Sequence, residues 1–166
     1  MSHVHRPFVL ALLALALCAS VAAAVPVTEL TAVHRDGQTF LTWRELPGTG
    51  WRYRVYSSDQ PILDAFSLEN TLIEGEVGDS TWCDRRLCRL TGVPYAFRID
   101  EEAPPLTGDR GLFVATTPAD HEAYYAVTAS RLGEFEDFLF VPGQNSMVTP
   151  VPEVLARPQP VLQRTM

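Results

Sequence analysis

The sequence predicts an all-β fold in which two sheets face each other. Short stretches that alternate between apolar and polar residues recur along residues 27–141, and about seven of them have the length of a strand. Prolines and glycines separate these stretches. Helical periodicity is weak, apart from one region at residues 61–77. Together these observations favour a two-sheet β-sandwich over a parallel α/β fold.

The first 24 residues are typical of a secretory signal peptide. A weakly basic start precedes an apolar run from Phe8 to Leu17, and the small residues that end at Ala24 offer a cleavage site. The run is shorter than the roughly 20 residues of a membrane-spanning helix. A membrane anchor and a lipoprotein start at Cys18 are the alternatives. We therefore expect a secreted or periplasmic protein whose mature chain begins at residue 25.

The charge balance limits the partners of the chain. It has 20 acidic residues against 13 arginines and lysines, which gives a net charge of −7. An acidic protein repels the nucleic-acid backbone and anionic membrane surfaces. No second apolar run of this kind follows the first. We expect no nucleic-acid partner and no membrane span, and an unidentified protein or polysaccharide as the partner.

Three strands are expected early in the mature chain. The dipeptide Asp36-Gly37 is a strong signal for a hairpin turn between the first two. In the second strand, Thr39, Leu41 and Trp43 share one face because side chains alternate along a strand. The three expected strands span residues 27–33, 39–44 and 52–58.

The middle of the chain departs from this alternation. Apolar residues within 61–77 lie near helical spacing, which predicts a short helix or an irregular excursion. Strand character then returns. The later expected strands span residues 96–99, 111–117, 123–130 and 134–141, and the last of them would close the sheet.

Prolines dominate the end of the chain, where they favour extended, unpaired backbone. This pattern predicts a linker toward a downstream domain in a longer parent chain, or alternatively a disordered tail. The expected organisation is a signal peptide at residues 1–24, a domain at 25–147 with an insert around 61–110, and a proline-rich linker or tail at 148–166.

The alternating faces also predict the core. Burial of a tryptophan contributes about 3–5 kcal/mol when measured by truncation to alanine, so Trp43 should be the most costly single core residue to remove. The expected core consists of Leu41, Trp43, Tyr53, Val55, Tyr125 and Val127.

Two groups of motifs carry a family resemblance. "LTAVHRDGQTFLTW" followed by "YRVYSS" resembles strands A, B and C of a fibronectin type III domain, in which a core tryptophan ends strand B. "YYAVTAS" followed by Gly133 resembles strand F and its turn into strand G, and Tyr125, Val127 and Ala129 match the family pattern Tyr-x-Val-x-Ala.

The resemblance covers roughly residues 27–141 and implies an immunoglobulin-like two-sheet β-sandwich. The stretch between the early and late strands is longer than the family usually has, so a long insert is expected there. The resemblance further implies that the Tyr125 hydroxyl ties a strand corner. Domains of this family usually mediate adhesion or space enzyme domains.

Cys83 and Cys88 are the only cysteines after the expected signal peptide. An even pair in an exported protein predicts a disulfide. Free thiols or a metal site are the alternatives, but a metal needs about four ligands and His34 and His121 lie far away in the sequence. We expect a Cys83–Cys88 disulfide, no metal and no cofactor.

The sequence contains no recognisable catalytic motif. A histidine with Ser130 or Ser146 and Asp120 would suit acyl transfer, but no Gly-x-Ser-x-Gly turn is present. The acidic run at residues 100–102 lacks the ligand spacing of a calcium loop, so a solvated loop is expected.

These expectations combine into a noncatalytic exported binding or spacer module of fibronectin type III type. The alternative is an N-terminal accessory domain of a secreted hydrolase whose catalytic domain is absent from this chain. A third hypothesis is that the insert at 61–110 forms a pocket for a glycan or another small molecule.

Overall fold

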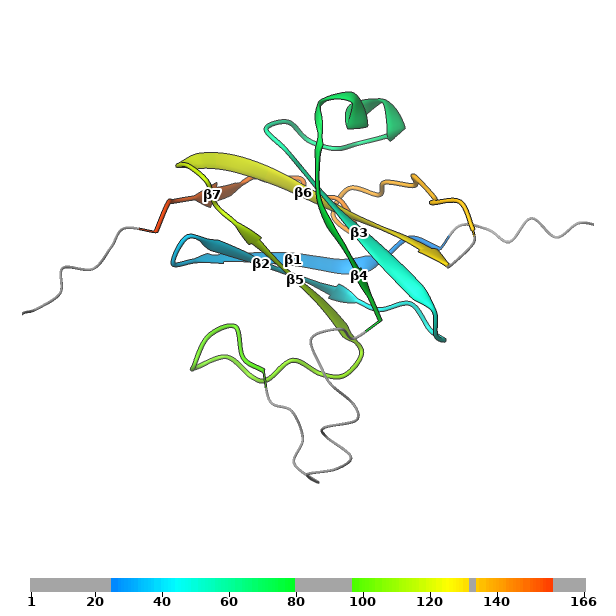
Figure 1. The fold of residues 1–166 in the computed structure, drawn as a ribbon, viewed down its shortest axis with the longest axis horizontal. Coiled ribbons are helices and arrows are strands. Elements are labelled where there is room, and N and C mark those ends of the chain that lie inside the picture. The colour runs from blue at the N-terminus through cyan, green and yellow to red at the C-terminus, as the bar shows by residue number, and fades with distance from the viewer. Residues whose placement is uncertain (1–24, 80–96, 132–133, 157–166) are drawn as a thin grey trace, which may run out of the picture.

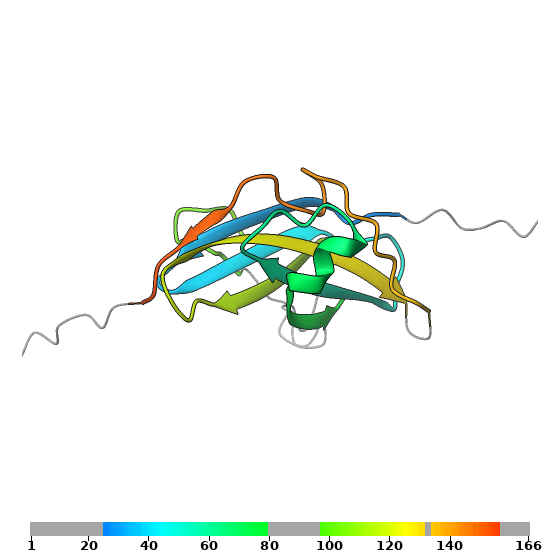
Figure 2. The same ribbon diagram turned by 90° about the horizontal axis from the view of Figure 1, so that it is seen from above.

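The computed structural model describes residues 25–79, 97–131 and 134–156. In this part of the chain two antiparallel sheets pack face to face (Figures 1 and 2), which confirms the predicted all-β sandwich. One sheet has the strand order β1-β2-β5, and the other has the order β4-β3-β6-β7. The strands are β1 (Thr28–Arg35), β2 (Gln38–Arg44), β3 (Trp51–Ser58), β4 (Leu72–Gly78), β5 (Arg110–Thr116), β6 (His121–Arg131) and β7 (Val151–Glu153).

A tight turn joins β1 to β2 at the predicted dipeptide. Asp36 has φ 51° and Gly37 has φ 75°, and two consecutive positive φ angles are the requirement of a type I′ hairpin turn. A Cβ atom at Gly37 would lie 2.6 Å from Cβ of Ala156. Glycine therefore satisfies both the backbone of the turn and the packing of the C-terminal segment against it.

The core between the sheets is built around Trp43. Its ring lies 5.4 Å from that of Tyr53, tilted by 51°, and it covers the backbone of Gly111 on the neighbouring strand β5, where a Cβ atom would lie 2.2 Å from the indole. Trp43 Nε1 is buried and makes no hydrogen bond to a described residue. The side chains that are at most 2% exposed include Leu41, Trp43, Tyr53, Val55, Tyr125 and Val127.

A second apolar cluster lies on the outer face of the β4-β3-β6-β7 sheet. Tyr56 and Ala126 project from β3 and β6, and Ile62 and Phe140 come from the segments that cross them. The rings of Tyr56 and Phe140 meet edge to face at 6.2 Å. The second sheet is therefore buried on both faces over part of its length.

The middle of the chain differs in part from the prediction. A 3-10 helix, η1 (Ala65–Asn70), forms the expected short helix, but β4 follows it and was not predicted. Glycine gives β4 a weak strand signal, although Gly75 is needed because a Cβ atom there would lie 2.7 Å from the Phe113 ring. The strand expected at 96–99 is absent over its described residues, where the Phe97 carbonyl instead accepts a loop hydrogen bond from Leu106.

The closing strand lies elsewhere than predicted. Residues 134–141 form no strand, and β6 is instead paired by Ser146 and by β7. The segment instead follows the outer face of the sheet, where Phe140 packs, while Phe135 is fully exposed. The linker expected from residue 148 onward thus contains an edge strand, and Pro152 is tolerated in it because an edge strand leaves one row of backbone groups unpaired.

We expect Trp43→Ala to lower the free energy of unfolding by about 3–5 kcal/mol. Trp51→Ala is the matched control, because Trp51 is half-buried and lies 4.5 Å from the Arg131 guanidinium; its loss should cost only about 1–2 kcal/mol. Urea unfolding followed by far-ultraviolet circular dichroism measures both. Equal losses would contradict the central role of Trp43, and Trp43→Phe provides a milder variant if the alanine form does not fold.

Candidate functional site

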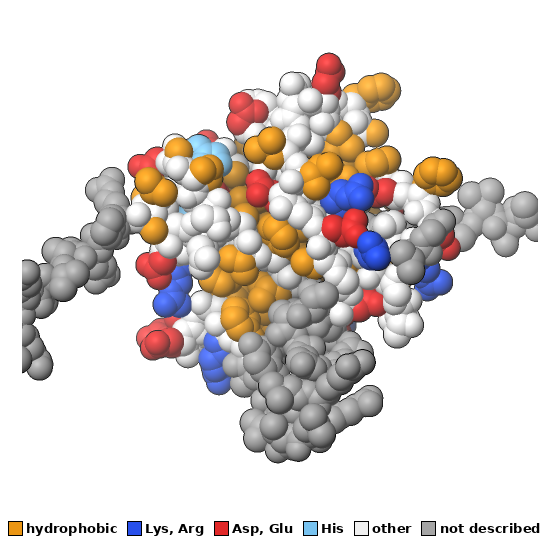
Figure 3. Space-filling model, viewed as in Figure 1, with side chains coloured by type: hydrophobic (Ala, Val, Ile, Leu, Met, Phe, Trp, Pro, Cys, Tyr) orange, Lys and Arg blue, Asp and Glu red, His pale blue; other side chains and the backbone are white. Residues whose placement is uncertain are grey.

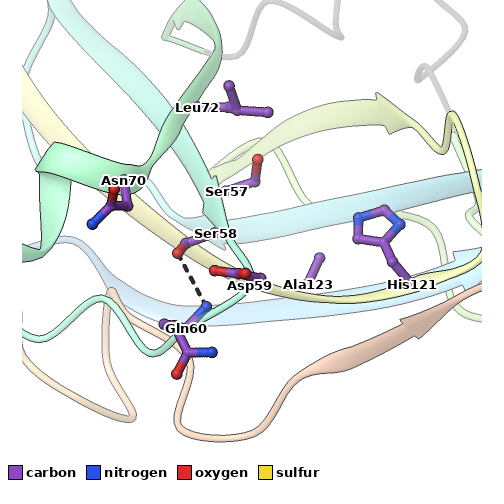
Figure 4. Close-up of a pocket in the computed structure, with 8 residues that line it drawn as sticks. All are labelled: Ser57, Ser58, Asp59, Gln60, Asn70, Leu72, His121 and Ala123. Atoms are coloured by element: carbon purple, nitrogen blue, oxygen red, sulfur yellow. Dashed lines mark hydrogen bonds between the residues drawn. The ribbon is translucent and has the colours of Figure 1, made fainter.

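A depression opens where β3, η1, β4 and β6 meet. Its volume is about 590 Å³. Figure 4 shows Asn70 and His121 on opposite sides of it, with Ser58 and Asp59 between them. The residues that line it are Ser57, Ser58, Asp59, Gln60, Asn70, Leu72, His121 and Ala123.

Local capping and burial position the η1 side of the depression. The Asp64 carboxylate accepts a hydrogen bond of 2.9 Å from the Ser67 backbone N–H, which satisfies the start of η1 and lowers the pKa of Asp64. Ile62 is fully buried beneath this segment, and the Ser146 hydroxyl donates to the Ile62 carbonyl. Asn70, the last residue of η1, therefore lies at the end of a segment whose start is anchored to the fold.

Several polar side chains of the depression face solvent without an internal partner. Asp59, Gln60 and Asn70 are exposed, and their side chains make no hydrogen bond to a described residue. Leu72 adds an apolar surface, since it is 70% exposed. The depression thus presents free donors, free acceptors and one aliphatic contact.

His121 joins the depression to a buried carboxylate. Its Nδ1 lies 2.7 Å from the Ala119 carbonyl; a carbonyl only accepts, so Nδ1 carries the proton. Its Nε2 lies 3.7 Å from Oε2 of Glu153, whose side chain is 2% exposed against 42% for His121. His121 therefore sits between solvent and the interior.

Glu153 is held by hydroxyl groups from both sheets. Tyr125 donates to it at 2.6 Å and Thr117 at 3.0 Å, and Thr39 donates as well. Burial and the hydrogen bond to Glu153 raise the pKa of Tyr125. The Tyr125 hydroxyl binds this carboxylate on β7, rather than tying a strand corner as the resemblance implied.

A second carboxylate, that of Glu136, organises the outer face of the β4-β3-β6-β7 sheet. Glu136 accepts hydrogen bonds from Arg54, Tyr56 and Thr128. Burial, followed by the hydrogen bond to Glu136, raises the pKa of Tyr56 to about 12. Apolar side chains on the face seen in Figure 3 lie among charged and polar ones.

The residues considered for acyl transfer are not brought together. His34 contacts Thr39 at 2.9 Å and the backbone of Val154 at 3.0 Å. Ser146 is committed to a carbonyl, and Asp120 accepts from the Leu155 N–H at 2.7 Å. These contacts hold the C-terminal segment in place.

The described residues contain no group of three or more histidine, cysteine, aspartate and glutamate side chains that would hold a metal. In the acidic run, Asp100 accepts from the Glu102 backbone at 3.2 Å, as in a solvated loop.

Cys83 and Cys88, the expected disulfide pair, lie outside the described residues. No helix in the described part is long and apolar enough to span a membrane.

Sequence reasoning did not single out Asp59, Gln60, Asn70 or Glu153. Asp59 and Gln60 lie in a bend and Asn70 ends η1; none of them belongs to a motif, and only the fold brings them together. Glu153 had a weak strand signal, because residues 151–154 read Val-Pro-Glu-Val, but the surrounding prolines favoured a linker.

We expect Glu153→Gln to lower the free energy of unfolding by about 1–3 kcal/mol, because hydrogen bonds to a charged acceptor are replaced by weaker ones. Glu122→Gln is the matched control on the exposed side of the β6–β7 pair and should change stability little. Urea unfolding measures the difference, and hydrogen exchange should show faster exchange along β7. Equal stability of the two variants would contradict the role of Glu153.

We also expect an alkaline loss of stability. Below pH 10, the ordinary pKa of tyrosine, Tyr56 is protonated in the folded and unfolded chain; between pH 10 and about 12 only the unfolded chain releases the proton. Stability should therefore fall as pH rises through this window, and Tyr56→Phe should make the fall shallower. Phenolate absorbance and circular dichroism measured against pH test this. Ionisation of Tyr56 at pH 10 with the fold intact would be inconsistent with its burial.

We compared the chain with family models, curated proteins and solved structures, and none of them matches it. Its function is therefore inferred from its own fold and surface.

Proposed function

We propose that the chain is a noncatalytic, exported module of fibronectin type III type that binds a partner or spaces neighbouring domains. The observation that supports this most is the distribution of strands between the sheets. In immunoglobulin-like sandwiches strands A and B share one sheet, and C, F and G share the other. Here β1 and β2 share one sheet, while β3, β6 and β7 share the other.

The two remaining strands suit the same assignment. β5 pairs with β2, as strand E pairs with strand B. β4 pairs with the free side of β3, in the place of a C′ strand. The strand motifs on which the resemblance depends therefore fall on β1, β2, β3 and β6, in the expected order.

The arrangement of the chain ends supports a spacing role. The described chain enters at one end of the longest axis, beside the start of β1, and leaves at the other end, after β7 (Figure 1). A module with its ends at opposite poles extends a chain in line and keeps neighbours apart. A binding role is supported by the depression, in which the side chains of Asp59, Gln60 and Asn70 make no hydrogen bond to a described residue.

The noncatalytic assignment is supported by the state of the histidines. His34 and His121 each contact a backbone carbonyl, and both lie beside the Glu153 network. His34 also contacts the Thr39 hydroxyl at 2.9 Å, but Thr39 is 0% exposed and its hydroxyl donates to Glu153, so no substrate reaches it as it would reach an activated nucleophile.

Mass spectrometry after export tests the proposal. When the full chain is produced in a bacterium with two membranes, we expect it in the periplasm, with Val25 as the first residue and a mass lowered by the two hydrogen atoms of a Cys83–Cys88 disulfide. Ala24→Arg should block cleavage and serves as the control. Retention of residues 1–24 on a cytoplasmic chain, or hydrolysis of glycan or ester substrates by the purified protein, would overturn the proposal.

A further inference from the structure

We infer that the depression between β3, η1 and β6 binds an uncharged oligosaccharide. This inference rests on the proposed function, because it names the ligand class of a binding module.

The exposed groups match the chemistry of sugar hydroxyls. Each hydroxyl both donates and accepts a hydrogen bond, and the amides of Gln60 and Asn70 offer both functions from one planar group. Asp59 adds a carboxylate that accepts from two hydroxyls at once. Leu72, at 70% exposed, provides an aliphatic surface for the C–H face of a sugar ring.

The charges at the depression disfavour an anionic ligand. Asp59 lines it directly, and the Ser57 hydroxyl on its wall donates to the carboxylate of Glu74. Beneath His121 lies the buried carboxylate of Glu153. Phosphate, sulfate or uronic acid groups would meet like charges here, and unfavourable pairs of this kind reduce affinity.

Backbone pairing disfavours a peptide that would add as an extra strand. Such binding needs an open row of backbone groups. At the depression, β3 is paired with β4 on one side and β6 on the other, and Ala123 of β6 is also paired with Val151. β4 is an edge strand of this sheet, but only its first residue, Leu72, lines the depression, so the depression offers mainly side chains.

The size and rigidity of the depression suit a short glycan. Its volume of about 590 Å³ lies within the roughly 300–1,000 Å³ of small-ligand sites. The contact of Ser146 with Ile62 and the capped start of η1 fix the backbone segment that leads to Asn70. A fixed backbone reduces the entropy lost on binding.

A glycan array with the purified full chain tests the inference. It should carry neutral and anionic oligosaccharides, with basic peptides on parallel spots. We expect binding confined to neutral glycans. The affinity for the best one, measured by calorimetry, should fall about fivefold to tenfold in both Gln60→Ala and Asn70→Ala, the effect of one lost hydrogen bond.

Matched controls separate the site from the rest of the surface. Gln144→Ala removes an exposed glutamine from the segment after β6 and should keep full affinity. Asp59→Asn removes the carboxylate that lines the depression. Its matched control is Asp137→Asn, which changes an exposed aspartate outside the depression. All variants change exposed side chains, so their melting temperatures should equal that of the unchanged protein.

Three outcomes would overturn the inference. They are no binding to any neutral glycan by the folded protein, preferential binding of anionic glycans or basic peptides, and neutral binding that Gln60→Ala and Asn70→Ala leave unchanged. Each of them leaves an exported spacer module standing, whereas failure of export or a hydrolytic activity would overturn the proposed function itself.

Discussion

The buried carboxylate of Glu153 is the point at which the two sheets depend on each other. A carboxylate loses its hydration on burial, and that loss is large unless donors replace the water. Here the donors come from β2, from the residue after β5 and from β6, through Thr39, Thr117 and Tyr125. No single sheet supplies them all. β7 therefore docks favourably only when both sheets are in register, and its docking couples the end of the chain to the core.

The dependence of both sheets on Glu153 gives the depression a rigid floor, whereas the side chains above that floor can vary. Ala123 is buried and paired with Val151 beneath the depression, so the floor is fixed by the same strand that carries Glu153. The polar side chains stand on turns above that floor, where their identity has little effect on packing. Binding residues are commonly carried in this way, on loops positioned by a stable scaffold. A change at Asn70 should alter recognition, whereas one at Glu153 should alter the fold.

The sequence was informative wherever one face of a strand was buried. Alternation located β2, β3, β5 and β6, and Asp36-Gly37 located the first turn, because local rules govern both. The prediction of strands from the sequence failed where burial or pairing came from distant segments. The excursion that carries Phe140 packs on the outer face of a sheet without forming a strand, and β7 lies among prolines because an edge strand tolerates them. β4 was missed because Gly75 makes room for Phe113 across the sandwich. The depression combines residues 57–72 with His121 and Ala123, and the pairing of β3 with β6 brings these two parts together, so no spacing could have indicated it.

The excursion between β6 and β7 also limits where a partner can bind. Asn145 is 1% exposed, donates to the carbonyls of Leu139 and Val127, and accepts from the Val141 N–H. With Glu136, it fastens the excursion onto the outer face of the second sheet. That part of the sheet is thus covered by the chain itself, and Tyr56 and Ala126 become interior residues. The depression lined by Asp59, Gln60 and Asn70 remains uncovered, so a partner that needs exposed polar groups finds them there rather than on the covered face.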